Sequence, residues 1–183
     1  AAGNDRYLLS EVEVMGKGGL TAQPVAHPQV SGNSLTLSGG NWKLQRASEV
    51  KQSGNEIASA AFLPDGWITA TVPGTVLTSY RNVGAVPDPN YSDNQLNISE
   101  AFFNSSFWYR NEFEVPESFI KKRVFLNFDG INWKAHVYLN GKKVGDIEGA
   151  FIRGKMDVTD CIVPGKNVLA VEIVKNSHIG AIK

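Results

Sequence analysis

The stretch from Arg123 to Gly145 constrains the fold more than any other part of the sequence. Apolar side chains recur at every second position of 124–129 and again of 134–139, which is the period of a strand with two different faces. Asn140 and Gly141 follow directly, and both residue types tolerate the positive φ that a type I′ turn requires. The stretch therefore predicts antiparallel strands with a tight hairpin turn.

Further segments carry a strand pattern. The segment 107–115 alternates cleanly and is followed by Pro116, which ends it. One face is predicted to hold the odd-numbered positions and the other the even-numbered ones. The remaining predicted strands are 34–37 and 42–44 as a pair, 67–72, 168–174, and a turn or short strand at 150–156. Many short strands separated by Gly, Pro and Asn turns predict an all-β, antiparallel two-layer sandwich.

Only one helix is predicted. An apolar stripe at positions i, i+1, i+4 and i+7 runs from Val76 to Val83, and Gly84 stands where a C-terminal cap belongs. The helix is short, so tertiary packing must stabilise it. The polar segment 51–61 fits either a short helix or a loop.

The length of 183 residues suits one large domain with an irregular lead-in. We expect residues 1–33 to form an irregular N-terminal arm, because glycines and prolines interrupt it, and 34–183 to form the sandwich domain. The segment 85–106 shows no period. Compact domains seldom keep a loop of this length unless it has a function, although it could also simply cover one end of the sandwich.

Charge and composition exclude some functions. Eighteen basic residues balance eighteen acidic ones, which argues against a dedicated nucleic-acid-binding protein. No apolar run approaches the roughly 20 residues of a membrane span. The lone Cys161 lies among apolar neighbours and is interpreted as a small buried hydrophobe. The three histidines, His27, His136 and His178, lack metal-ligand spacing, so no metal or cofactor is assigned. The compartment stays open, with a bacterial periplasmic or secreted location favoured.

A set of motifs in fixed order resembles the N-terminal domain of glycoside hydrolase family 2. The resemblance covers about 37–174 and looks closest to the β-mannosidase and exo-β-glucosaminidase branch, on the strength of VPGTVL followed by VPDPNYSDN. The motifs are VPG at 72–74, PDP at 87–89 with Tyr91 and Asn94, WYRNEFEVP at 108–116, FDGINWKAHVYLNGKKVG at 128–145, GAF at 149–151, DVTD at 157–160 and PGKNVLAVEI at 164–173.

The resemblance implies a jelly-roll, galactose-binding-domain-like sandwich that precedes an immunoglobulin-like domain and a catalytic (β/α)₈ barrel. Enzymes of this family retain anomeric configuration and use two glutamates on the barrel. The family's acid/base follows an asparagine, and this chain has Asn55-Glu56 and Asn111-Glu112. Neither pair has a barrel around it, so no catalytic residue is expected here and the chain alone is expected to be inactive.

The resemblance also implies a substrate-reaching loop, which corresponds to 87–97. Asn94 corresponds best to a substrate-contacting asparagine, and Asp93 is the alternative. The competing interpretation is a loop asparagine that caps its own backbone. In the family the domain continues beyond 168–174, so this chain is expected to be truncated at the C-terminal end of its sandwich.

Three functions remain open from the sequence. The first is a non-catalytic sugar-binding and buttressing domain of a retaining exo-β-glycosidase, with carbohydrate and the downstream domains as partners. The second is a free-standing carbohydrate-binding module, and the third is a purely structural interdomain module. Trp108 and Arg110 could form a sugar-stacking platform, but interdomain packing or cation–π pairing is the favoured interpretation.

Overall fold

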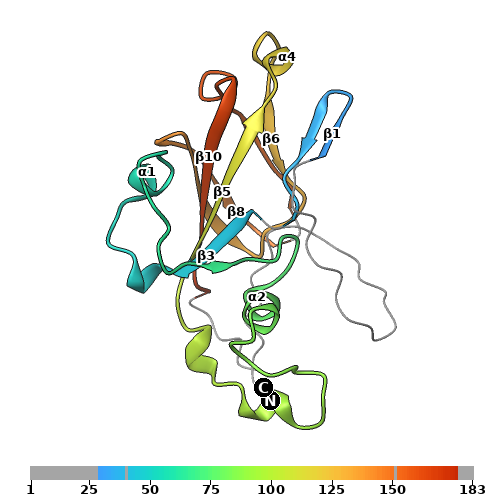
Figure 1. Cartoon of the computed structure of the whole chain (residues 1–183), viewed down its shortest axis with the longest axis vertical. Helices are drawn as coiled ribbons and strands as arrows, with labels where there is room; N and C mark the ends of the chain where they lie inside the picture. Colours follow the sequence, from blue (N-terminus) through green and yellow to red (C-terminus); the bar gives the residue numbers. More distant parts are fainter. Residues whose placement is uncertain (1–28, 40, 151, 177–183) are drawn as a thin grey trace.

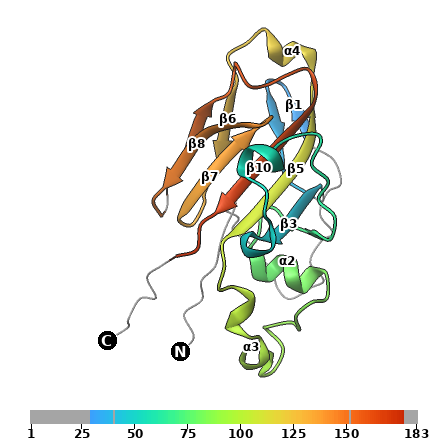
Figure 2. The ribbon, with the colours of Figure 1, turned by 90° about the vertical axis from the view of Figure 1, so that its left-hand side faces the viewer.

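The computed structural model describes residues 29–39, 41–150 and 152–176, and it shows antiparallel strands packed in layers around a common core (Figures 1 and 2). Six strands form the larger sheet in the order β4-β3-β5-β10-β7-β8, while β1-β2 and β6-β9 form two small sheets. The predicted all-β, antiparallel sandwich is confirmed. The strands are β1 (Gln29–Ser31), β2 (Ser34–Thr36), β3 (Trp42–Arg46), β4 (Ile68–Thr69), β5 (Phe107–Val115), β6 (Phe125–Phe128), β7 (Lys134–Leu139), β8 (Lys142–Glu148), β9 (Gly154–Asp157) and β10 (Gly165–Ile173).

Strand β5 lies at the centre of the larger sheet and carries the predicted two faces. Its odd-numbered side chains, from Phe107 to Val115, are buried, and all but Asn111 belong to the main core cluster. Its outward Trp108 belongs to a second buried cluster with Ile57 of helix α1 (Gly54–Ile57). Both faces of β5 are therefore covered, one by the small sheets and the other by α1.

The hairpin between β7 and β8 confirms the turn expected from Asn140-Gly141. Asn140 has φ 49° and Gly141 has φ 79°, so both central residues occupy the left-handed region of a type I′ turn. The β7 bounds coincide with the predicted 134–139. The hairpin continues as β8, with a register irregularity at Val137/Tyr138.

Gly141→Val should lower the free energy of unfolding by at least about 1–2 kcal/mol, because a β-branched residue resists positive φ. A Cβ at this position would meet nothing closer than the Asn55 carbonyl oxygen at 3.7 Å, so a steric clash is not the cause. Urea unfolding of the two variants Gly141→Val and Gly141→Asn checks this, since asparagine tolerates left-handed backbone. Equal stability of these variants would contradict the argument.

The predicted helix is α2 (Val76–Asn82). Thr75 caps its first turn by accepting the N–H of Thr78. At its end Gly84 has φ 76° and donates to the Arg81 carbonyl, while Ala85 donates to the Tyr80 carbonyl. This pair of bonds is a Schellman motif, which confirms Gly84 in the predicted capping role.

Three further helices are only four residues long. Helix α1 settles the open segment 51–61, because Ser53 and Glu56 form a capping box that starts a helical turn there. The other two, α3 (Asn94–Asn97) and α4 (Glu117–Ile120), have no apolar stripe and were not expected. Two 3₁₀ turns, η1 (Ala47–Glu49) and η2 (Glu100–Phe102), complete the helical elements. The segment 85–106 therefore contains α3 and η2 and is not wholly irregular.

The predicted pairing of 34–37 with 42–44 is wrong. Strand β2 pairs with β1 instead, and β3 lies between β4 and β5. The N–H of Gly39 donates to the Val72 carbonyl, so the connecting segment does not close a hairpin. The predicted strand 67–72 is also shorter, because only Ile68–Thr69 is strand. Residues 29–31 of the expected N-terminal arm form β1, and residues 1–28 lie outside the described residues.

Candidate functional site in the segment 85–106

The segment 85–106 projects from the sandwich. In Figure 2, α3 lies beyond α2 at the end of the molecule opposite α4. Helix α2 forms the base of the projection and is fixed by the buried Ser79, whose hydroxyl accepts the N–H of Thr71 and donates to the Thr75 carbonyl. The projection therefore starts from a rigid support.

Asp88 organises the first half of the projection. Its carboxylate accepts from Arg81 Nη2 at 2.8 Å and from the N–H of Asn90 at 3.0 Å. Its carbonyl accepts from Asn94 Nδ2 at 2.9 Å. One residue thus links α2, the following turn and α3. The PDP motif contained Asp88, but sequence reasoning assigned it no role, because only the folded loop brings Arg81 and Asn94 to it.

The structure separates the two predicted substrate contacts. Asn94 is half-buried at the start of α3, and its amide nitrogen is engaged by the loop backbone. No described residue donates to its Oδ1, which stays available as an acceptor. Asp93 is exposed at the N-cap position of α3, and its side chain makes no capping bond. Asn94 is therefore oriented by the loop and Asp93 is not.

Aromatic side chains anchor the second half of the projection to the core. The Tyr80 ring meets Phe102, Phe103 and Phe107 edge-on at centroid distances of 5.6, 6.3 and 6.4 Å. Arg46 also lies over the Phe102 ring at 5.5 Å. Between its two anchored ends the projection exposes Tyr91 and Leu96, at 73% and 79%.

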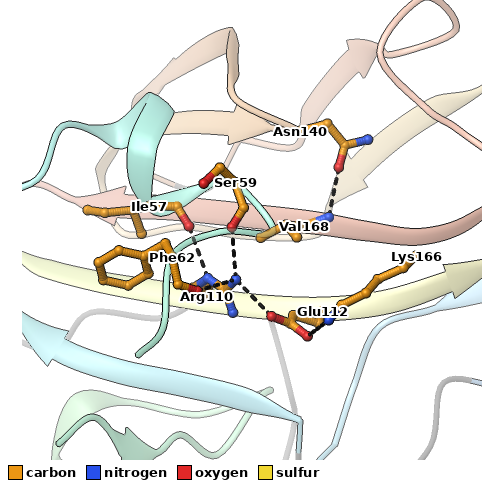
Figure 3. A network of polar contacts seen from close by, with 8 residues as sticks. All are labelled: Ile57, Ser59, Phe62, Arg110, Glu112, Asn140, Lys166 and Val168. Carbon is orange, nitrogen blue, oxygen red and sulfur yellow. Dashed lines mark hydrogen bonds and ion pairs between the residues drawn. The ribbon is translucent and has the colours of Figure 1, made fainter. Parts of the chain in front are cut away.

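Arg110 is a structural residue beneath α1 and its following loop. It is 2% exposed. As Figure 3 shows, it donates to the carbonyls of Ile57, Ser59 and Phe62 at 2.9, 3.1 and 3.2 Å. Its guanidinium also lies 5.8 Å from the Phe62 ring centre. The favoured cation–π interpretation is confirmed for Arg110, and a sugar platform is excluded there because no surface is available.

Trp108 and Tyr138 also serve packing. Trp108 is buried and its ring lies 5.7 Å from that of Tyr138. The Tyr138 ring in turn covers Gly54 of α1 so closely that a Cβ on that glycine would come within 2.4 Å of it. These aromatic rings hold α1 against the sheet.

The glutamates of the two Asn-Glu pairs are held by structural contacts. Glu112 contacts Arg110 at 2.8 Å and Lys166 at 2.6 Å. Burial acts to raise the pKa of Glu112, but the hydrogen bonds from Lys166 and Arg110 outweigh it and lower the pKa. The hydrogen bonds of the Ser53 cap lower the pKa of Glu56. A glycosidase general acid needs a raised pKa, so neither environment suits that role.

The described residues show neither a metal-binding cluster nor a membrane-spanning helix. No three His, Cys, Asp or Glu side chains gather there in a way that could hold a metal ion. His136 bonds Asp146 instead, while His27 and His178 lie outside the described residues. None of the described helices has both the length and the apolar character that crossing a membrane requires. Cys161 packs against the core as a small hydrophobe, as predicted, but it is only half-buried.

Comparison with known families decides the classification. Residues 42–182 match the family described as glycosyl hydrolase 2 galactose-binding domain-like. The chain belongs to this family. The resemblance carried by the ordered motifs is thereby confirmed.

Relatives of the glycosyl hydrolase 2 domain include two from the predicted branch. An exo-β-D-glucosaminidase of Streptomyces avermitilis is 30% identical over 158 residues, which covers 85% of this chain and 17% of the relative. A mannosylglycoprotein endo-β-mannosidase of Lilium longiflorum is 37% identical over 150 residues, covering 77% and 16%. This chain therefore spans about one sixth of the length of these glycoside hydrolases.

Solved structures show the same fold. The crystal structure of an exo-chitosanase of Amycolatopsis orientalis matches with a TM-score of 0.69 at 28% identity, over 76% of this chain and 16% of that one. A β-D-mannosidase of Dictyoglomus thermophilum matches with a TM-score of 0.61 at 29% identity, over 75% and 15%. This chain therefore corresponds to only 16% and 15% of these two solved chains.

Proposed function

We propose that this chain is the non-catalytic N-terminal domain of a retaining exo-β-glycosidase, and that it binds sugar next to a catalytic barrel encoded beyond residue 183. The relatives, which are glucosaminidases and mannosidases by name, support the enzyme class. The structural contacts of Glu56 and Glu112 support a non-catalytic role, since Glu56 belongs to a helix cap and Glu112 is paired with Arg110 and Lys166.

One observation carries the sugar-contacting part of the proposal. Asn94 is oriented by its bond to the Asp88 carbonyl, yet its Oδ1 has no donor among the described residues. An amide oxygen presented in this way can accept from a sugar hydroxyl, while the exposed tip around Tyr91 meets the neighbouring domain. A contact that strengthens as the sugar ring distorts contributes more to the transition state than to ground-state binding.

Asn94→Ala in the complete enzyme should lower kcat/KM by about tenfold or more, which corresponds to about 1.4 kcal/mol. Asp93→Ala tests the alternative residue, because its side chain is exposed and not oriented by the loop. Steady-state kinetics on an aryl β-glycoside gives the measurement. A large effect of Asp93→Ala alone would assign the contact to Asp93.

A second control separates sugar contact from loop order. Arg81→Met breaks the ion pair with Asp88 but removes no group from the tip of the loop. If Arg81→Met lowers kcat/KM as much as Asn94→Ala, the effect comes from loop order. If Asn94→Ala and Asp93→Ala both keep wild-type kcat/KM, the domain is a structural buttress. Glycan binding by the 183-residue chain alone would instead favour a free-standing carbohydrate-binding module.

A further inference from the structure

Asn140-Gly141 is the only asparagine–glycine pair in the sequence. An asparagine loses its side-chain amide when the backbone nitrogen of the next residue attacks its Cγ atom and closes a cyclic imide. Glycine favours this attack because it has no Cβ to hinder the approach. The two residue types therefore make Asn140 the most reactive asparagine of the chain, unless the fold opposes the reaction.

Helix α1 holds the attacking nitrogen. The Gly141 N–H donates to the carbonyl of Ala58, the residue that follows α1, at 3.0 Å. Ala58 is fully buried, so water has little access to this bond. The nitrogen becomes a nucleophile only after a base removes its proton, and the Ala58 carbonyl occupies that proton. While α1 lies on the hairpin, Gly141 is therefore unreactive.

Strand β10 and the turn before it hold the other reacting atoms. Asn140 Nδ2, the leaving group, donates to the Cys161 carbonyl at 2.8 Å and to Asn167 Oδ1 at 2.7 Å. Asn140 Oδ1 accepts the N–H of Val168 at 2.8 Å, and Figure 3 shows the side chain directed at that strand. Attack at Cγ makes the planar carboxamide tetrahedral, and loss of Nδ2 breaks two of the bonds. The three bonds together oppose both steps.

We propose that Asn140 is a deamidation site that the fold keeps closed, and that it reacts when the β7-β8 hairpin separates from α1 and β10. A base takes the Gly141 amide proton, the nitrogen bonds to Asn140 Cγ, and the Cγ–Nδ2 bond breaks with release of ammonia. Water then opens the ring on either side and leaves aspartate or isoaspartate at position 140. The net reaction consumes only water, and the inference does not depend on the proposed function.

The product cannot restore the closed hairpin. Aspartate has only acceptors, so an oxygen would face the Cys161 carbonyl and Asn167 Oδ1 in place of a donor. In isoaspartate the main chain runs through the side-chain methylene, which lengthens a type I′ turn that fits two residues only. An opening that is reversible before the reaction therefore becomes permanent after it.

Peptide mapping by mass spectrometry tests the proposal on the wild-type chain, incubated at mildly alkaline pH in buffer and in urea. Asn104 is the internal reference, because it is exposed, is followed by Ser105, and has no side-chain hydrogen bond to another described residue. In urea Asn140 should deamidate faster than Asn104, since glycine follows it. In buffer the order should reverse, and Asn140 should react at least about 100-fold more slowly than in urea. An Asn140 that outpaces Asn104 in buffer as well, or that stays unreacted in urea, overturns the proposal.

A pair of variants on α1 tests whether the helix controls the reaction. A Cβ at Gly54 would clash with the Tyr138 ring, so Gly54→Ala pushes α1 away from β7. In buffer this variant should raise the deamidation rate of Asn140 at least about tenfold, whereas Asn55→Ala, an exposed change on the same helix, should leave it unchanged. Equal rates in the two variants would show that α1 does not protect the site. The comparison of Asn140 with Asn104 needs no variant, so it stays decisive if Gly54→Ala does not fold.

The permanence of the change has its own test. Asn140→Asp reproduces one product and should unfold at a lower urea concentration than the wild-type chain, because a donor is replaced by an acceptor at two contacts. An unchanged unfolding midpoint would show that the hairpin closes again after the reaction.

Discussion

Arg110→Met is expected to lower the free energy of unfolding by about 3–5 kcal/mol. Methionine fills a similar volume, so the loss comes from polar groups and not from a cavity. The guanidinium satisfies three carbonyls, those of Ile57, Ser59 and Phe62, which lie where α1 and its loop cover the sheet. Without it, these carbonyls either remain unbonded or draw α1 away from Trp108. Chemical denaturation measures the loss, and a change in the near-ultraviolet circular dichroism, to which Trp108 contributes as one of four tryptophans, reports displacement of α1.

Two variants separate the parts of this effect. Arg110→Lys keeps the charge beside Glu112 but cannot reproduce the planar set of donors, so it should recover only part of the loss. Glu112→Gln keeps Arg110 on its carbonyls and should cost far less. A loss for Glu112→Gln equal to that for Arg110→Met would place the energy in the ion pair and contradict the carbonyl argument.

The ion pair makes its own contribution, which depends on pH. Because the folded-state pKa of Glu112 is lowered from 4.5, its contribution is present above that value and is lost as the pH falls through the folded pKa. In Glu112→Gln this part of the acid sensitivity should disappear. The contribution is small because the Glu112 side chain is 35% exposed.

The sequence predicted the faces of β5 correctly because the period of a strand is a local property. It could not show that Arg110 is buried, since burial depends on α1, which is more than fifty residues away in the sequence. The same limit explains the wrong pairing of 34–37. The turn-like residues after 34–37 suggested a hairpin with 42–44. In the structure β2 pairs with β1 instead, and β1 lies in a region where glycines and prolines interrupt any recognisable strand pattern.

The candidate site was predictable only through family resemblance. The segment 85–106 shows no hydrophobic period, and the short helix α3 has no apolar stripe from which it could be predicted. The role of Asp88 arises from three contacts with residues on both sides of it, and spacing alone does not single it out. The type I′ turn at Asn140-Gly141 is the opposite case, because its φ angles follow from the two residue types themselves.

That turn is tied to the start of β10 by a pair of asparagines. Asn140 Nδ2 donates to Asn167 Oδ1 at 2.7 Å, and Asn140 Oδ1 accepts the N–H of Val168 at 2.8 Å, as Figure 3 shows for the second bond. Asn167 is fully buried and also donates to the carbonyls of Val163 and Gly165. The Asn167 side chain therefore stabilises the 163–167 turn from within and links that turn to the β7-β8 hairpin through Asn140.

Asn167→Ala is expected to lower the free energy of unfolding by about 2–4 kcal/mol. The carbonyls of Val163 and Gly165 and the Val163 N–H lose their Asn167 partner together, and Asn140 Nδ2 keeps only its bond to the Cys161 carbonyl. Asn167→Asp keeps the acceptor but directs a second oxygen toward the two carbonyls, so it should be nearly as destabilising. Asp160→Ala, an exposed change in the preceding turn, should stay within about 0.5 kcal/mol of wild type. Because β10 pairs with both β5 and β7, loosening its start should also speed amide exchange at Asn140, whose N–H donates to the Val168 carbonyl. Unchanged stability of Asn167→Ala would mean that water replaces the side chain and that the turn folds without it.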